Sequence, residues 1–219
     1  MAYPATFDVP APTQFDKAQV ALRIAIIFVL AILQVGGIVF GGAYLVLPIV
    51  AAVMIAQKGS EKYIAEADSG PTRWLRFLVM FYSYMALATD KMSTDDPNQV
   101  VKLDVRASGK PTVGSALLRI ILGIPHAIVL GFIGIAFAIV WIISAVSILI
   151  NGNYPEWAFN FIRGYLRWNT RVLAYMASLV DEYPPFSFGD GEAMVPASAP
   201  TPPPAPPAEP PAAPPASGN

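Results

Sequence analysis

Two long uncharged segments limit what this chain can fold into. The first runs from residue 24 to residue 57 and the second from residue 120 to residue 155, and neither contains an Asp, Glu, Lys or Arg. Only 13% of all residues are charged, against about 25% in soluble domains. Because so much continuous apolar sequence would aggregate in water, the bilayer is its natural solvent. The sequence therefore predicts an all-α integral membrane protein.

The two segments belong to an internal repeat. Leu22-Arg23-Ile24 before the first segment recurs as Leu118-Arg119-Ile120 before the second, 96 residues later. After the segments the offset becomes 91, so that residues 84–91 align with residues 175–182. A fixed period decides architecture before any local pattern does. We expect two tandem membrane units at residues 1–97 and 98–190, followed by a tail at residues 191–219.

The length of each segment predicts a helical hairpin. One helix over the first segment would be ~51 Å long at ~1.5 Å per residue, whereas the hydrocarbon core is ~30 Å thick. Glycine pairs at residues 36–37 and 41–42 provide a turn in the first segment, and Gly131 and Gly134 a weaker one in the second. We expect two short transmembrane hairpins; re-entrant hairpins or one long tilted helix remain alternatives.

The positions of the cations predict the topology. All 14 Lys and Arg lie outside the two segments. If each segment enters the membrane and returns, every cation is on one side, and the positive-inside rule makes that side cytoplasmic. We therefore expect a multi-pass protein of the bacterial cytoplasmic (inner) membrane with both termini in the cytoplasm.

An amphipathic helix follows each hairpin, and the second is the clearer one. At residues 157–181, aromatic and aliphatic side chains fill one arc and polar ones the other, which is typical of a helix lying in a membrane interface. Arg163, Arg167 and Arg171 are one turn apart on the polar arc. They are candidate contacts for anionic lipid headgroups or an acidic partner, at ~1 kcal/mol per cation. The alternative is a solvated edge without a ligand.

Extended segments and a biased tail complete the chain. Residues 100–105 alternate like a strand, and residues 7–9 are their counterpart, so the two could pair on the cytoplasmic face. Eleven of the 22 prolines lie between residues 196 and 215. This composition predicts a disordered tail with polyproline II character, acting as a spacer or as a ligand for a soluble partner.

Four motifs of the second unit carry a resemblance. They are Leu118-Arg119 through Pro125-His126 to Leu130, Asn153-Tyr154-Pro155, Leu166-Arg167-Trp168, and Asp181-Glu182-Tyr183-Pro184-Pro185-Phe186. Together they resemble the bacterial membrane family catalogued as domain of unknown function 4389, over about residues 98–188. The first unit is a diverged copy that lacks the Ile-Pro-His and Tyr-Pro-Pro-Phe motifs. The resemblance implies an inner-membrane protein and brings no activity with it.

Two residues of the second unit are candidates for polar roles in the membrane. Arg119 stands at the entrance of the hairpin, where we expect it to reach a lipid phosphate. His126 follows Pro125 inside the apolar segment, and an ionisable group there is a candidate functional site. The alternative is that neutral His126 donates a hydrogen bond, across the hairpin, to a carbonyl freed by Pro125.

The sequence offers no catalytic constellation. It has no cysteine and a single histidine, and it contains no Ser-His-Asp spacing and no phosphate loop. We therefore predict no catalytic, cofactor or metal site and no enzyme activity. The net charge of −1 without a basic cluster argues against nucleic acid. We expect a scaffold or accessory subunit whose partner is a membrane protein or a second copy. The alternative is a small transporter or lipid-handling protein with a path between the hairpins, lined by His126 and the arginine row.

Overall fold

The structure is a computed structural model that describes residues 3–12, 14–93 and 95–189. The proline-rich tail predicted at residues 191–219 lies outside these ranges. The described chain is mostly helical, as predicted. Its elements in order are β1 Ala5–Asp8, α1 Lys17–Ile32, α2 Gly36–Gly41, α3 Ala43–Lys58, α4 Ser60–Ala65, α5 Pro71–Met85, the short 3-10 helix Pro97–Gln99, β2 Lys102–Val105, α6 Val113–Asn151 and α7 Glu156–Met176.

The second uncharged segment forms one helix, so the hairpin predicted there is wrong. α6 has 39 residues and continues through Gly131, Gly134 and Pro125 without a turn. Thr112 and Ser115 form a capping box at its start, and Gly152, at φ 69°, ends it. A glycine costs a helix about 1 kcal/mol relative to alanine. The packing of α6 along α3 and α7 outweighs that cost.

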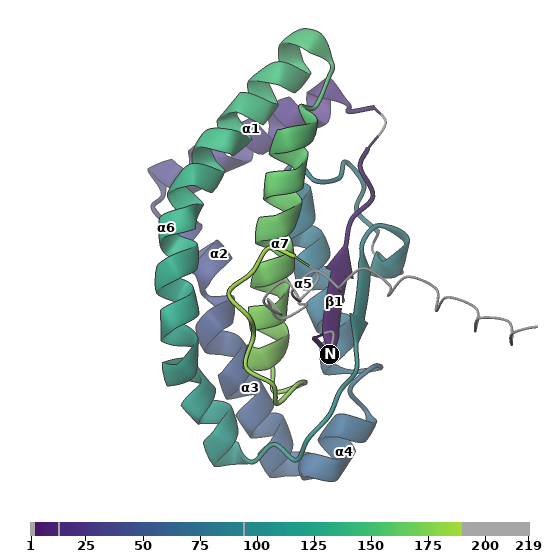
Figure 1. The fold of residues 1–219 in the computed structure, drawn as a ribbon, viewed down its shortest axis with the longest axis vertical. Coiled ribbons are helices and arrows are strands. Elements are labelled where there is room, and N and C mark those ends of the chain that lie inside the picture. The colour runs from purple at the N-terminus through teal and green to yellow at the C-terminus, as the bar shows by residue number, and fades with distance from the viewer. Residues whose placement is uncertain (1–2, 13, 94, 190–219) are drawn as a thin grey trace, which may run out of the picture.

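The first uncharged segment is broken, close to the predicted glycine hinge. α1 ends at Ile32, Gln34 takes a positive φ of 55°, and the chain resumes as α2 and then α3. Figure 1 shows α1, α2 and α3 following one another along α6, from its C-terminal end to its N-terminal end. Consistent with this, Lys17 Nζ donates to the carbonyl of Leu149 at 2.8 Å. The segment thus runs antiparallel to α6, and its two arms do not fold back on each other.

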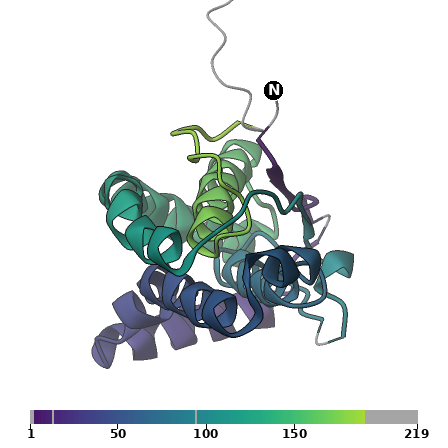
Figure 2. The ribbon, with the colours of Figure 1, turned by 90° about the horizontal axis from the view of Figure 1, so that it is seen from below.

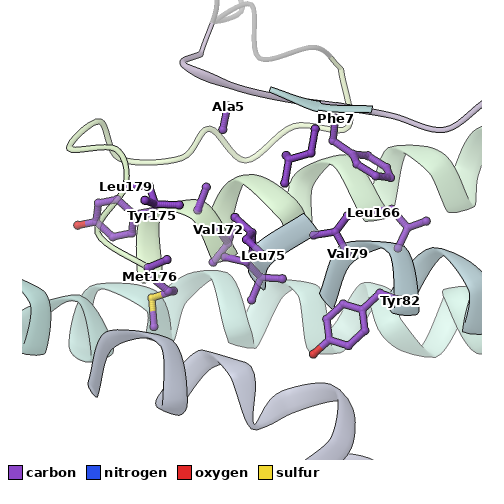
Figure 3. Close-up of a cluster of buried hydrophobic side chains, with 14 of the residues drawn as sticks. Ala5, Phe7, Leu75, Val79, Tyr82, Leu166, Val172, Tyr175, Met176 and Leu179 are labelled. Carbon is purple, nitrogen blue, oxygen red and sulfur yellow. The ribbon is translucent and has the colours of Figure 1, made fainter. Parts of the chain in front are cut away.

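α7 lies inside the protein and forms its centre. It packs against α6, α3, α5 and β1, and Figure 2 shows it between α6 on one side and α5 with the strands on the other. Val172, Leu173 and Ala174 are fully buried. Figure 3 shows Phe7 of β1 pointing down towards α7, with Leu75 and Val79 of α5 lower in the view. The predicted amphipathic helix is present, but its polar arc is covered by the strands and by the segment after α7.

The two predicted extended segments pair. β1 and β2 are antiparallel, with Phe7 opposite Leu103 and Asp8 opposite Lys102. Phe7 and Leu103 point into the core, whereas Thr6 and Asp104 are exposed. The ribbon therefore covers α7 with the period-two alternation that the sequence shows.

The stretch from α1 to α3 and the helix α6 carry many exposed apolar side chains, here together called the apolar belt. It consists of Leu22, Phe28, Val29, Ile32, Leu33, Ile38, Val46, Ile49 and Val53 from the stretch α1 to α3 and of Leu117, Leu118, Ile121, Ile124, Ile128, Phe132, Ile135, Ile139, Ile142, Val146 and Ile150 from α6, all exposed. Exposed apolar patches of this extent mark a membrane or a protein interface. Among the described helices, α6 is long and apolar enough to cross a membrane.

Candidate functional site

Arg119 of α6 holds the end of α7. Its Nη1 donates to the carbonyls of Tyr175, at 2.6 Å, and Val180, and its Nη2 lies 2.6 Å from Asp181 Oδ1. The guanidinium also lies 4.4 Å from the centre of the Tyr175 ring. Arg119 is 4% exposed. It therefore faces these carbonyls, and not the surface where a lipid phosphate was expected.

Arg23 of α1 makes a corresponding ion pair and ring contact, although the sequence pattern did not mark it as a candidate site. Its Nη2 lies 2.6 Å from Asp90 Oδ1, and its guanidinium is 3.9 Å from the centre of the Tyr84 ring. Arg23 precedes Arg119 by 96 residues, and Tyr84 and Asp90 precede Tyr175 and Asp181 by 91. The repeated Leu-Arg-Ile tripeptide was the available signal.

The same backbone turn brings each aspartate to its arginine. Leu87 after α5 and Ser178 after α7 both have positive φ, 63° and 55°. The N–H of Ala88 donates to the Ser83 carbonyl, and the N–H of Leu179 donates to the Ala174 carbonyl. This six-to-one bond after a left-handed residue is a Schellman cap. Each cap turns the chain back so that the following aspartate meets the arginine.

His126 lies in an aromatic cluster that joins the second-unit motifs. Its Nδ1 accepts a hydrogen bond from Trp168 Nε1 at 3.1 Å, and its ring stacks on Phe186 at 4.0 Å. Tyr183 closes the cluster, with its ring centre 4.8 Å from that of His126. His126 is fully buried, and its Nε2 has no partner among the described residues. The bond is thus to an indole, not to the carbonyl freed by Pro125.

The three arginines of α7 bind the chain itself. Arg167 donates to the Phe7 carbonyl at 3.1 Å and to Asp8 Oδ1 at 2.8 Å. Arg171 is buried and donates to the carbonyls of Ser187 and Gly189. Arg163 is the most accessible, with 31% of its side chain exposed and Nη1 3.8 Å from Asp8 Oδ1. Of the predicted row, Arg163 alone keeps a surface position suited to an outside ligand.

A large cavity, here called the central cavity, lies among α1, α2, α3, α5, α6 and α7. Its volume is about 590 Å³, and its lining includes Gly37, Gly41, Tyr82, Gly131, Gly134 and Tyr165. Neither His126 nor any arginine lines this central cavity. The candidate residues predicted from the sequence therefore do not line the central cavity.

The ionisable residues do not gather into a metal-binding group. In residues 3–12, 14–93 and 95–189, no three His, Asp or Glu are close enough to hold a metal ion. The acidic residues are instead distributed among ion pairs, such as Asp68 with Arg76 and Glu66 with Lys58. The pKa of Glu66 is lowered, chiefly by the hydrogen bond from Lys58.

Comparison with known proteins identifies the second half of the chain. Residues 114–187 match the family described as a domain of unknown function, DUF4389. The match covers the ion pair of Arg119 with Asp181 and the cluster of His126 with Trp168 and Phe186. No curated protein and no solved structure matches the chain. From residue 114 to residue 187, the chain thus matches the model of the DUF4389 family.

Proposed function

We propose that this protein is a non-catalytic scaffold or accessory subunit seated in the bacterial cytoplasmic membrane by its apolar belt. The belt is the observation that carries the proposal, because water would disfavour so much exposed apolar surface by about 25 cal/mol for each Å². Arg119, Arg167 and Arg171 support a structural role, since each donates to carbonyls or carboxylates of the same chain.

The length of α6 favours a seating along one leaflet. Its 39 residues would be ~58 Å long at ~1.5 Å per residue, and its exposed apolar residues extend from Leu117 to Ile150. Keeping that whole length within a core of ~30 Å would require a tilt of roughly 60°, beyond the usual ~0–40°. A helix lying in the interface needs no such tilt.

The distribution of cations also favours a one-sided seating. Lys17 lies at the end of the molecule where α6 finishes, and Lys58 lies at the opposite end, where α3 finishes (Figure 1). If the belt crossed the bilayer, these cations would be on opposite sides. The positive-inside rule favours placing both in the cytoplasm. This retains the predicted cytoplasmic location of both termini without any crossing.

Single-cysteine labelling tests the seating, because the native chain has no cysteine. Lys110→Cys precedes α6 and Asn153→Cys follows it, and both positions are exposed. With a membrane-impermeant maleimide, we expect neither to react in intact cells and both to react in inverted vesicles. Labelling of permeabilised cells is the control for reactivity. Reaction of one position in intact cells would show that α6 crosses the membrane.

We further propose that the chain consists of two copies of one unit related by a pseudo-twofold axis. The axis would pass beside the pair Phe7 and Leu103, which occupy equivalent repeat positions. Arg76 donates to the Leu103 carbonyl at 3.3 Å, and its counterpart Arg167 donates to the Phe7 carbonyl at 3.1 Å. An arginine of each unit thus donates a hydrogen bond to the strand of the other unit. The two arginine–aspartate pairs described above support the same relation.

The proline-rich sequence at residues 191–219 is the proposed binding segment for a soluble partner of the scaffold. Such a sequence can dock into an aromatic groove of a soluble protein. We expect affinity purification from mild detergent to recover fewer partners with a form that ends at residue 190 than with the full chain. An unchanged set of partners would remove the tail from the proposal and leave a membrane protein or a second copy.

A transporter is the second candidate, and the central cavity is the observation that favours it. A path for a polar solute needs several polar groups at membrane depth. His126, however, lies under Trp168 and Phe186 and not on the cavity wall. We therefore expect no substrate flux in proteoliposomes. Flux that His126→Ala abolishes would favour the transporter over the scaffold.

A further inference from the structure

Small residues create the central cavity. Gly37 and Gly41 of α2 face Ala127, Gly131, Gly134 and Ala138 of α6 across it. A Cβ atom added at Gly37, Gly41 or Gly131 would meet nothing within 4 Å. The space between the two apolar segments is thus open because these positions lack side chains, and larger residues there would fill it.

The cavity opens onto the apolar belt. Gly37, Gly131 and Ala138 of its lining are themselves exposed. The belt residues next to them in sequence, Ile38 and Phe132, are 74% and 72% exposed. No charged residue lies in either segment around this opening. A molecule entering the cavity from this side therefore comes from the apolar medium that covers the belt.

Three polar side chains of the cavity wall donate their hydrogen bonds within the protein. The Tyr44 hydroxyl donates to Asn169 Oδ1 at 2.7 Å, and the Tyr82 hydroxyl donates to the Phe40 carbonyl at 3.0 Å. Trp141 Nε1 donates to the Met85 carbonyl at 2.8 Å. These pairings leave the three side chains with no donor for a polar ligand. The wall suits a ligand that presents only carbon and hydrogen.

We propose that the central cavity binds one acyl chain of a bilayer phospholipid, which enters sideways from the leaflet. The volume of about 590 Å³ is within the ~300–1,000 Å³ of ligand pockets. If a methylene group takes about the ~30 Å³ of a water molecule, the cavity holds on the order of 15–20 of them. The headgroup stays outside, at the level of the belt. The inference rests on the proposed membrane seating, and not on the scaffold role.

Photocrosslinking tests the occupant. The protein is reconstituted in phosphatidylethanolamine and phosphatidylglycerol vesicles containing a phosphatidylethanolamine with a diazirine in its acyl chain. Tyr82 and Met85 of α5 are nearly buried and line the cavity, so they are reached only through it. We expect their peptide to be labelled. Labelling confined to belt residues such as Phe132 would overturn the proposal.

Matched glycine variants make the test specific. Gly131→Leu and Gly37→Leu fill the cavity, whereas Gly36→Leu adds the same side chain at a neighbouring open position outside the lining. We expect labelling of the Tyr82 and Met85 peptide to fall several-fold in both filling variants and to stay unchanged in Gly36→Leu. Equal labelling in all variants would overturn the proposal. Having two filling variants keeps the test valid if one fails to fold.

Two further measurements distinguish a failure of membrane binding from a failure of the proposed lipid site. Flotation of the vesicles shows whether the protein binds them, and failure to float would count against the membrane seating itself. A photoreactive free fatty acid added from water tests the source of the chain. We expect weaker labelling of the Tyr82 and Met85 peptide by this probe than by the phospholipid. Stronger labelling by the fatty acid would overturn the assignment to a bilayer lipid.

Discussion

Arg119 Nη2 and Asp181 Oδ1 lie 2.6 Å apart and fasten the end of α7 to α6. The same guanidinium also donates to the carbonyl of Val180 and to that of Tyr175, which in addition accepts from the Ser178 N–H. Asp90 and Arg23 repeat the ion pair after the end of α5. Arg119 therefore caps the end of α7, and Arg23 fastens the turn after α5 to α1.

Arg119→Met should destabilise the protein by about 2–4 kcal/mol, because the Val180 carbonyl loses its Arg119 donor, the Tyr175 carbonyl loses one of two donors, and Asp181 loses its ion pair. Asp181→Asn should cost less, since the Asp181 side chain is half exposed and Arg119 keeps both carbonyls. Thermal unfolding in detergent measures both changes. Arg106→Met, at an exposed position, is the control and should stay within about 0.5 kcal/mol of wild type. A similarly small effect of Arg119→Met would contradict the capping role.

Ser178→Gly should stabilise the protein by roughly 1 kcal/mol, because the left-handed conformation is costly for a residue with a Cβ. Ser178 has φ 55°, and its buried hydroxyl has no partner among the described residues. Ser178→Ala is the matched control, since it removes the hydroxyl and keeps the Cβ. Glycine should therefore give the higher melting temperature. If alanine equals it, backbone strain is not the cause.

The sequence predicted the helices and strands themselves better than it predicted which parts of the chain pack against them. The 3.6-residue period of α7 and the alternation of the two strands are local, and both features are present. The sequence placed the arginine arc of α7 in water or at headgroups, because periodicity shows which residues share a face but not what covers it. β1 covers Arg167, and the segment after α7 covers Arg171.

The turn predicted at Gly131 and Gly134 failed for an energetic reason. Two glycines weaken a helix by about 2 kcal/mol in total, which tertiary packing exceeds. In α6 these glycines leave space for the central cavity. The cavity itself was not predictable, since it depends on how α2, α5 and α7 meet α6. Arg23 was missed because its partner Asp90 lies 67 residues away.

His126→Phe should destabilise the protein by about 1–3 kcal/mol, because the buried N–H of Trp168 loses its acceptor. In a Trp168→Phe background that donor is already absent, so the same substitution should cost less, by at least about 1 kcal/mol. A double-mutant cycle on thermal unfolding measures the difference. Equal costs in both backgrounds would show that the bond contributes nothing and that His126 acts through packing alone.

Tyr63 should make the stability fall at alkaline pH. Its hydroxyl donates to the Ala177 carbonyl, and burial raises the pKa of Tyr63 to about 12 from 10.0. The unfolded chain therefore loses this proton at a lower pH than the folded protein does. The stabilisation is complete below pH 10 and is lost as the pH rises towards 12, by about 1.4 kcal/mol for each pH unit at most.

Tyr63→Phe isolates this contribution, because other buried tyrosines such as Tyr82 also have a raised pKa. The variant loses the bond to Ala177 and should be less stable than wild type at neutral pH. Its free energy of unfolding should fall less steeply than that of wild type between pH 10 and pH 12. Chemical denaturation at several pH values measures both slopes. Parallel slopes would mean that Tyr63 ionises at the same pH in the folded and the unfolded chain.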